Sequence, residues 1–343
     1  MTYPPASKLI ECDNRMRING REKWCDFVDG GNGFLYGIPY NASKVVEFNT
    51  KDESIKEIGP DLGDATQKYG GGVRAENGSI YCIPYYGMKS FLKITPFEGG
   101  DAEVRILDDK LPEEGYFLWK GGALAQDGCI YYMPLVASRI LKLDPSNDDS
   151  ISLVGEALLQ GWTKYTESIV GNDNCIYGIP FDKRIQTVKF NPVLNSICYV
   201  YIDLVGKGSF SGGVLASDGN IYTANSFGQV IKMDTTNNKY LITGNKLRNG
   251  KIWDWNWGPP VVGANKCIYF PPLNHDRILQ FNPSTQKMSL IDNFCGCEPE
   301  KWYGCSLASN GFIYCVPYNA KKLLRIDSRH VNEQIIEFVH VMK

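Results

Sequence analysis

Residues 119–155 read WKGGALAQDGCIYYMPLVASRILKLDPSNDDSISLVG and predict a small antiparallel sheet of four strands. The first strand is short and apolar, and it ends at the Asp-Gly pair 127–128, a dipeptide that favours a tight hairpin turn because both residues tolerate positive φ. A second strand around Tyr131 ends at a proline, which has no N–H to donate to a sheet. Residues 139–143 alternate polar and apolar side chains as a third strand, and residues 150–154 supply the fourth.

The apolar phrase around this tyrosine recurs along the whole chain at intervals of 45 to 50 residues. Four positions before each tyrosine stands an Asn or Asp, usually followed by glycine. The seven anchor tyrosines are Tyr36, Tyr81, Tyr131, Tyr177, Tyr222, Tyr269 and Tyr314. Repeats of this length with four strands each are typical of propeller blades. We therefore predict an all-β, seven-bladed β-propeller of four-stranded antiparallel blades, a single domain over residues 1–343.

The chain ends bear on how the ring closes. Residues 8–12 resemble the predicted outer strand 239–243, so residues 1–23 are expected to supply a closing strand before the first full repeat. That strand should pair in the last blade beside strands from residues 306–327, because an open ring would leave an unpaired sheet edge. Residues 334–339 are a second candidate for the same outer position.

Composition narrows the class of protein. The 36 basic and 38 acidic residues give a net charge of −2, which argues against a general binder of duplex nucleic acid. The sequence shows neither a run of eighteen apolar residues nor a secretion signal, so we expect a soluble chain, monomeric on its own, in the cytoplasm or an organelle lumen. The eleven cysteines are an odd number and favour buried, reduced thiols over a disulfide framework.

The repeat resembles the broad β-propeller superfamily and is similar in architecture to the kelch, NHL and gluconolactonase-like groups. The resemblance covers nearly the whole chain and implies the fold, not a function. Lactonase-type propellers hold a divalent metal in the channel with several carboxylate and amide side chains. The nearest analogues here are Asp26, Asp29 and Glu167, which are scattered along the inner strands without an amide partner. Because no zinc-ligand spacing, nucleophile elbow or dinucleotide fingerprint is present, we predict no metal, no cofactor and no catalytic residue.

Two columns of the repeat could form a ligand site on one face of the ring. An aromatic residue stands twelve positions before each anchor, where the chain enters the innermost strand: Trp24, Tyr69, Trp119, Tyr165, Phe210, Trp257 and Trp302. Basic residues open the third strand on the same face in six repeats: Lys44, Lys89, Arg139, Arg184, Arg277 and Lys322. These columns could bind an anionic or planar ligand by stacking, cation–π contacts and charge-assisted hydrogen bonds. Alternatively, the aromatics wedge between blades and the basic residues only solvate loops, an interpretation that the regular period favours.

Departures from the repeat are better functional candidates, since packing does not require them. Seven positions before the anchor, five repeats have an apolar residue, but the first two have Asp29 and Arg74. We expect these two side chains within salt-bridge reach, either as a plain ion pair or as a polar subsite. Residues 251–257 (KIWDWNW) contain three alternating tryptophans, which a strand would place on one side. This stripe is either an exposed binding surface or a packed blade boundary.

These patterns favour a non-enzymatic binding or scaffold propeller that presents an aromatic and basic face to a protein or a small anionic ligand. The candidate binding residues are Trp253, Trp255, Arg277, Lys322, Arg139, Lys44, Asp29 and Arg74. The alternative is a channel-centred, metal-dependent hydrolase or lyase of the lactonase type. Neither nucleic acid nor a membrane is expected as a partner.

Overall fold

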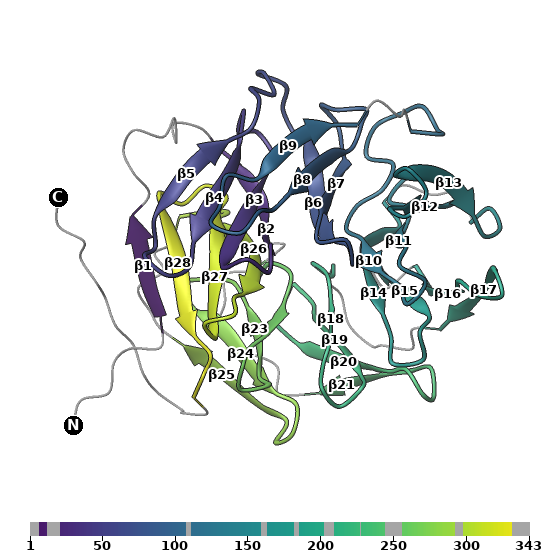
Figure 1. The fold of residues 1–343 in the computed structure, drawn as a ribbon. Helices are drawn as coiled ribbons and strands as arrows, with labels where there is room; N and C mark the ends of the chain where they lie inside the picture. Colours follow the sequence, from purple (N-terminus) through teal and green to yellow (C-terminus); the bar gives the residue numbers. More distant parts are fainter. Residues whose placement is uncertain are drawn as a thin grey trace.

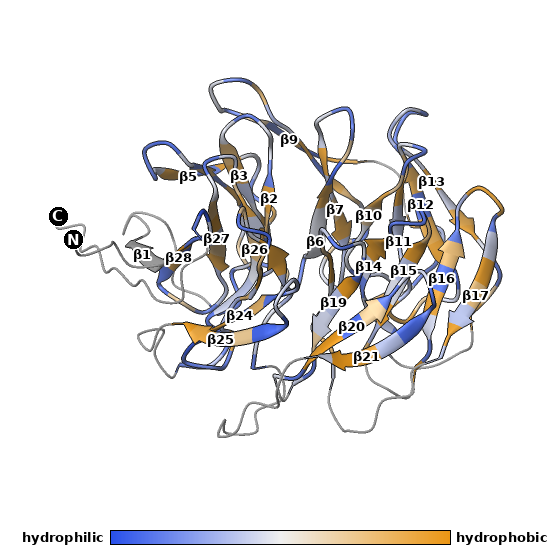
Figure 2. Ribbon diagram, turned by 90° about the horizontal axis from the view of Figure 1, so that it is seen from below, coloured by the Kyte–Doolittle hydropathy of each residue, from blue (hydrophilic) through white to orange (hydrophobic). Residues whose placement is uncertain are grey.

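The fold is an all-β ring of seven four-stranded antiparallel sheets, as the repeat predicts (Figure 1). The computed structural model describes residues 7–11, 21–107, 111–158, 163–181, 185–201, 209–226, 228–243, 256–291 and 298–330. Within these ranges no helix is long and apolar enough to span a bilayer. Figure 2 shows apolar residues concentrated along the strands and hydrophilic residues in many of the connecting turns.

Each blade is built in chain order from the inner to the outer strand. Blade 1 comprises β2 (Trp24–Asp29), β3 (Phe34–Pro39), β4 (Val45–Asn49) and β5 (Ile55–Ile58). Blade 2 comprises β6 (Tyr69–Arg74), β7 (Ile80–Pro84), β8 (Leu92–Thr95) and β9 (Glu103–Ile106). Blade 3 comprises β10 (Ala123–Leu124), β11 (Ile130–Tyr132), β12 (Ile140–Asp144) and β13 (Ser150–Val154). Blade 4 comprises β14 (Tyr165–Val170), β15 (Ile176–Pro180), β16 (Thr187–Asn191) and β17 (Ser196–Val200).

The remaining blades follow the same plan until the ring closes. Blade 5 comprises β18 (Val214–Leu215), β19 (Ile221–Ala224), β20 (Val230–Asp234) and β21 (Lys239–Thr243). Blade 6 comprises β22 (Val261–Val262), β23 (Ile268–Phe270), β24 (Ile278–Asn282) and β25 (Lys287–Ile291). Blade 7 takes β26 (Trp302–Leu307), β27 (Phe312–Pro317) and β28 (Lys322–Asp327) from the end of the chain, and its outer strand is β1 (Ser7–Glu11).

The closing strand β1 runs antiparallel to β28. Ser7 lies opposite Ile326, and Glu11 lies opposite Lys322. The sheet order β1-β28-β27-β26 therefore joins the two ends of the chain in one blade, which removes the open edge of the ring. The competing segment 334–339 lies outside the described residues.

The anchor tyrosines lie in the second strand of each blade, and all seven are at most 2% exposed. Each phenol hydroxyl hydrogen-bonds to the Asn or Asp four positions earlier, at 2.7 to 3.1 Å. The hydroxyl of a buried tyrosine needs a partner, and the turn residue supplies one in every blade. The repeat thus conserves a contact that ties the hairpin turn to the blade core.

The aromatic column twelve positions before the anchors is structural. All seven side chains are buried, with exposures of 4% or less. The four indole N–H groups donate to the backbone carbonyl at the start of the third strand, as from Trp119 to Arg139 at 2.8 Å. These rings fill the space between blades and leave no exposed face for a ligand.

A column of buried lysines, one position earlier still, fastens neighbouring blades. Lys23 donates from Nζ to the carbonyl of Ala320 at 2.9 Å, and Lys164 donates to that of Val136 at 3.0 Å. Lys68 contacts the carbonyls of Asn41 and Ala65 in the same way, and Lys301 those of Leu273 and Glu298. These ammonium groups satisfy loop carbonyls on the face where the inner strands begin, and so they fix the loops that surround the axis.

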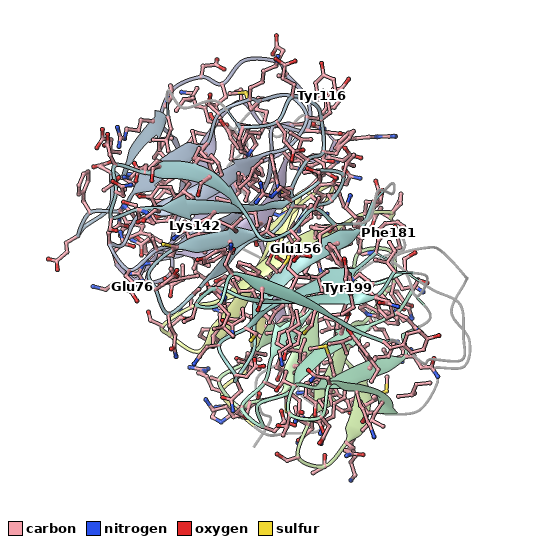
Figure 3. The ribbon with its side chains drawn as sticks, turned by 90° about the vertical axis from the view of Figure 1, so that its right-hand side faces the viewer. Glu76, Tyr116, Lys142, Glu156, Phe181 and Tyr199 are labelled. Atoms are coloured by element: carbon pink, nitrogen blue, oxygen red, sulfur yellow. The ribbon has the colours of Figure 1, made fainter. Side chains whose placement is uncertain are left out.

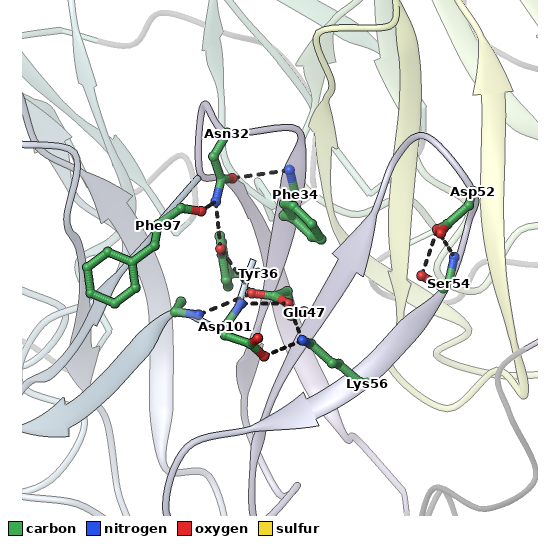
Figure 4. A network of polar contacts seen from close by, with 10 residues as sticks. Asn32, Phe34, Tyr36, Glu47, Asp52, Ser54, Lys56, Phe97 and Asp101 are labelled. Carbon is green, nitrogen blue, oxygen red and sulfur yellow. Dashed lines mark hydrogen bonds and ion pairs between the residues drawn. The ribbon is translucent and has the colours of Figure 1, made fainter. Parts of the chain in front are cut away.

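Blades 1 and 2 are also joined by a network around the buried carboxylate of Glu47 (Figure 4). Tyr36 donates its hydroxyl to Glu47 at 3.2 Å, and Lys56 lies 3.1 Å from the same carboxylate. The backbone N–H groups of Asp101 and Ala102 donate to it from blade 2 at 3.3 Å. One carboxylate therefore serves as the shared acceptor between two blades.

Candidate functional site

A cavity of about 730 Å³ opens at the end of the ring where the inner strands begin. Five of its lining residues lie within three positions after the second strand of five different blades: Tyr85, Leu135, Phe181, Leu273 and Tyr318. Only a position on the ring axis can reach residues of blades 2, 3, 4, 6 and 7 together. The volume lies in the range of small-molecule sites, and we call this space the axial cavity. Phe181 and Tyr116, both part of the lining, are labelled in Figure 3.

Aromatic rings form a nearly continuous wall of the axial cavity. The ring centroids of the lining residues Tyr303 and Tyr318 lie 5.7 Å apart. Tyr40 is not a lining residue, but its ring packs between Tyr318, at 5.5 Å, and Tyr85, at 6.0 Å. Phe117 meets Tyr85 edge-on at 4.8 Å. These separations are those of mutually packed aromatic pairs. The wall is therefore preformed, and it presents flat apolar faces to whatever enters.

A lysine stands among these rings. Lys120, just before β10, donates from Nζ to the hydroxyl of Tyr303 at 2.7 Å, which joins blade 3 to blade 7 across the axis. The same Nζ lies 4.9 Å from the ring centroid of Tyr303 and 5.9 Å from that of Tyr85. Burial opposes the charged form, but Tyr303 and Tyr85 stabilise the ammonium, so that the net effect raises the pKa of Lys120 above its ordinary value.

Two carboxylates lie in the channel one position farther along the inner strands. Asp26 projects from β2 of blade 1 and Glu167 from β14 of blade 4, and both are half-buried. The equivalent position is glycine in four other blades: Gly71, Gly121, Gly212 and Gly304. A Cβ atom at Gly121 would overlap Oε1 of Glu167, and one at Gly304 would crowd Asp26. The missing side chains thus provide the space that the two carboxylates occupy.

The environment brings both carboxylates close to neutral pKa values. Desolvation raises the pKa of Asp26 to about 8, with a further contribution from repulsion by Glu167. Desolvation likewise raises the pKa of Glu167 to about 7. The nearby Lys120 ammonium and backbone N–H groups, including that of Gly72 for Asp26, work in the opposite direction. Carboxyl groups with such pKa values beside a cavity can exchange protons near neutral pH, as acid–base residues do.

The donor set does not fit a divalent metal ion. Among the described residues, no group of three His, Cys, Asp or Glu side chains is placed to share one ion. The two channel carboxylates have the Lys120 ammonium as a neighbour, and that charge would repel a second cation. The metal chemistry of the lactonase-type alternative therefore has no support in this arrangement.

The sequence-predicted basic residues lie outside the axial cavity. None of Lys44, Arg139, Arg277 and Lys322 lines it, because third strands begin away from the axis. Arg139 donates from Nε and Nη2 to the carbonyl of Gly155 at 3.0 and 2.7 Å, so its guanidinium caps its own blade. The predicted binding residues Trp253 and Trp255 lie outside the described residues.

Asp29 and Arg74 lie at the opposite end of their inner strands. The Asp29 carboxylate accepts the N–H of Gly31 at 2.9 Å within its own turn. The Arg74 guanidinium packs against Gly31, so that a Cβ atom there would overlap it. Both side chains therefore lie near the same turn. Among the described residues, however, no ion pair within 4.0 Å joins Asp29 to Arg74. The expected direct pair is replaced by a carboxylate that caps its own backbone.

Sequence reasoning missed the position that carries the site. Eleven residues before the anchors, five repeats have Cys, Gly, Thr, Ser and Gly, whereas two have Lys120 and Tyr303. Lys120 and Tyr303 depart from the repeat pattern at this position, just as Asp29 and Arg74 depart from it seven residues before the anchors. That departure is the sequence signal that could have identified them. Asp26 and Glu167 were noticed only as an incomplete metal set, because sequence separation hides their proximity to Lys120.

The described chain is thus a seven-bladed β-propeller with an axial cavity that is aromatic at its wall and charged at its base. Neither a protein-family model nor a curated protein matches the sequence. Among solved structures, a catalytically inactive variant of virginiamycin B lyase from Staphylococcus aureus, solved with quinupristin, matches with a TM-score of 0.74 and 13% identity over 94% of this chain and 98% of that one. A streptogramin B lyase matches with a TM-score of 0.70 and 13% identity, covering 93% of this chain and 96% of that one.

Proteins of other kinds share the fold as well. The extracellular domain of a putative one-component system from B. thetaiotaomicron matches with a TM-score of 0.67 and 10% identity, covering 98% of this chain and 46% of that one. An auxiliary nutrient binding protein from Bacteroides ovatus matches with a TM-score of 0.55 and 11% identity, covering 95% of this chain and 77% of that one. At such low identities the likeness is one of fold, and this fold is used by an enzyme and by extracellular domains alike.

Proposed function

We propose that this propeller binds a small organic ligand in the axial cavity. The observation that carries the proposal is the Lys120 ammonium, held among aromatic rings by the hydroxyl of Tyr303. Lys120 is half-buried, so its charge is partly removed from water, which is unfavourable, and the repeat does not need it, since five of the other six blades have a small residue at this position. A charge kept at that cost in a cavity is expected to serve a ligand.

The aromatic wall and the polar end of the cavity can make different kinds of contact with a ligand. The rings of Tyr85, Phe117 and Tyr318 offer apolar faces against which a flat or cyclic group can pack. The ammonium of Lys120 and the hydroxyl of Tyr303 offer directional hydrogen bonds at one end. A few polar groups placed in an otherwise apolar pocket are the usual arrangement for orienting a small molecule. The scaffold role and the protein partner that the sequence predicts for the aromatic and basic face stay predictions.

A thermal-shift screen of a metabolite library tests this function. Sugars, nucleosides, amino acids and cyclic peptides would be screened against the wild type, Lys120→Met and Tyr303→Phe. Tyr303→Phe keeps the ring and removes only the hydroxyl, so it tests the hydrogen bond without emptying the cavity. Compounds that stabilise the wild type should lose most of that effect in both variants. Lys44→Met serves as the comparison, because Lys44 belongs to the basic column outside the cavity. Hits that depend on Lys44 and not on Lys120 would contradict the axial site.

A second candidate function is proton-transfer catalysis in the channel next to the axial cavity. The observation that favours it is the pair Asp26 and Glu167, with pKa values of about 8 and about 7 next to Lys120. At neutral pH one carboxyl group can accept a proton from a bound ligand while the other still holds one to donate, which is the requirement of an elimination or hydrolysis step. The fold likeness to a lyase is compatible with this chemistry and does not establish it.

Binding and catalysis can be separated by following each hit over time by ¹H NMR. An enzyme should convert the ligand, and Asp26→Asn or Glu167→Gln should slow the conversion by about 10² to 10⁴ while binding persists. A ligand that binds and stays unchanged for hours in the presence of the wild type would favour a binding protein.

A further inference from the structure

A second cavity of about 480 Å³ adjoins the axial cavity on the side of blades 2 and 3. Its lining includes Met88, Lys89, Glu113 and Glu114, and it shares Tyr85 and Tyr116 with the axial cavity. Because Tyr85 and Tyr116 contribute to both linings, the two cavities are neighbours. A ligand longer than one ring could therefore pass over Tyr85 and Tyr116 and occupy both spaces.

An exposed aromatic cluster includes Tyr116, which lines both cavities, and Tyr86, which lines neither but packs on Tyr116. Tyr86 is 42% exposed and Tyr116 is 54% exposed, with ring centroids 4.6 Å apart. Phe117 stacks on Tyr86 at 5.1 Å and an interplanar angle of 24°. We call Tyr86, Tyr116 and Phe117 the aromatic platform. Large exposed aromatic groups gathered in one place are a mark of a binding surface.

The charges around the two cavities disfavour an acidic ligand. Glu113 and Glu114 line the second cavity, and Glu300 lines the axial one. Glu22 lies near Glu300, and burial together with repulsion by that carboxylate raises the pKa of Glu22. Among the described residues, the lysines in the two linings are Lys89 and Lys120, against the three carboxylates of Glu113, Glu114 and Glu300. An anionic ligand would meet repulsion from several sides.

Carboxylates beside aromatic faces suit a ligand with hydroxyl groups on its edge. If an apolar ring covered Glu114 or Glu300, the carboxylate would lose water without gaining a hydrogen bond, which is costly. A sugar ring has apolar C–H faces that can pack on tyrosine, and hydroxyl edges that can donate to carboxylates and accept from Lys89 or Lys120. Such a ligand satisfies both kinds of lining at once.

We propose that the two cavities and the aromatic platform form one extended site for a neutral oligosaccharide of two or more linked rings. One ring occupies the axial cavity with its hydroxyls toward Lys120 and Tyr303, and a following ring packs on Tyr86 and Tyr116. This inference rests on the proposed function and adds the ligand class and the direction in which the ligand extends.

The test is affinity as a function of chain length. Neutral linear oligosaccharides of one to six residues, built from glucose, xylose, mannose or N-acetylglucosamine in α and β linkage, would be arrayed beside acidic sugars and cyclic peptides, and hits would be titrated by calorimetry. Affinity for the matching neutral series should rise with each added ring until both cavities are filled and then level off. Tyr86→Ala should weaken the longer members by about tenfold and leave the shortest binding member nearly unaffected, whereas Tyr116→Ala, at a residue that lines both cavities, should weaken the longer members more than the shortest one.

Tyr199 provides the matched control. It is 44% exposed on β17 and lies away from Tyr116 in Figure 3. Tyr199→Ala should leave every affinity unchanged, and Tyr303→Phe should weaken members of all lengths because it acts in the axial cavity. Affinity that does not change with chain length, or that ignores both platform variants, would overturn the extended site.

The outcomes also separate this inference from the proposed function. If only acidic sugars or cyclic peptides bind, and binding depends on Lys120 and Tyr303, the oligosaccharide is wrong and the axial site survives. If nothing in the array or in the metabolite library binds, both proposals are contradicted.

Discussion

Removing the channel carboxylates of Asp26 and Glu167 should make the free energy of unfolding depend less on pH. This prediction follows from the surroundings of the two groups and can be tested without a ligand. The pKa of Asp26 is raised to about 8 and that of Glu167 to about 7, whereas both groups ionise near pH 4 in an unfolded chain. Between about pH 4 and 8 the folded protein therefore holds protons that the unfolded chain has released. Stability consequently falls as pH rises through this window, and the stabilising contribution of the neutral carboxyl groups is gone above pH 8.

The size of the effect follows from proton linkage. Each group that is protonated only in the folded state contributes a slope of about 1.4 kcal/mol per pH unit. Both side chains are half-buried and border a channel, so solvent reduces this slope. We expect the free energy of unfolding to drop by at least about 1 kcal/mol between pH 6 and 8. Asp26→Asn and Glu167→Gln together should remove most of that drop.

Urea unfolding at each pH unit from 5 to 9 measures the slope. Asp52→Asn is the control, because Asp52 is exposed and hydrogen bonds from Ser54 lower its pKa. Its contribution is complete above about pH 4 and is lost only as the solution becomes more acidic, so this control should not alter the slope between pH 6 and 8. Wild-type stability that stays level or rises between pH 6 and 8 would refute the reasoning, as would an unchanged slope in the double variant.

Three substitutions test the packing that supports the site, each by urea unfolding. Glu47→Ala removes the shared acceptor of blades 1 and 2 and should cost about 3 kcal/mol, while a loss below about 0.5 kcal/mol would mean that the network is incidental. Gly121→Ala places a Cβ atom against Glu167 at a φ of +58°, so it should cost more than about 1 kcal/mol and also change the pH slope; a neutral result would show that the channel is looser than described. Trp257→Ala empties a blade boundary and should cost about 3–5 kcal/mol, whereas unchanged stability would contradict the structural role of the aromatic column.

The fold could be predicted from sequence because its determinants are local and repeated. Each blade carries its own turn signal and its own buried tyrosine, and the hydrogen bond between Asn77 and Tyr81 spans only four residues. Seven copies of one local pattern leave few alternatives to a closed ring. The same regularity explains why the aromatic column is structural, because a residue that every blade requires serves the blade.

The site could be predicted only in part, because it depends on distances between blades. Lys120 and Tyr303 are 183 residues apart in sequence, yet they share a hydrogen bond across the axis. The sequence pointed to the face of the ring on which the axial cavity opens, but it assigned the binding chemistry to residues such as Arg277 and Lys322, which open third strands and do not line that cavity. Without the radial position of each column, a basic residue at the rim cannot be distinguished from one at the channel.

The most direct test of the axial site is a crystal structure of the protein with the tightest ligand from the screens. We predict that the ligand lies in the axial cavity, against the rings of Tyr85 and Tyr318, with a polar atom within hydrogen-bond distance of Nζ of Lys120 or the hydroxyl of Tyr303. A ligand held instead by the rim residues Lys44, Arg139 or Arg277, with the axial cavity filled only by water, would contradict the central claim.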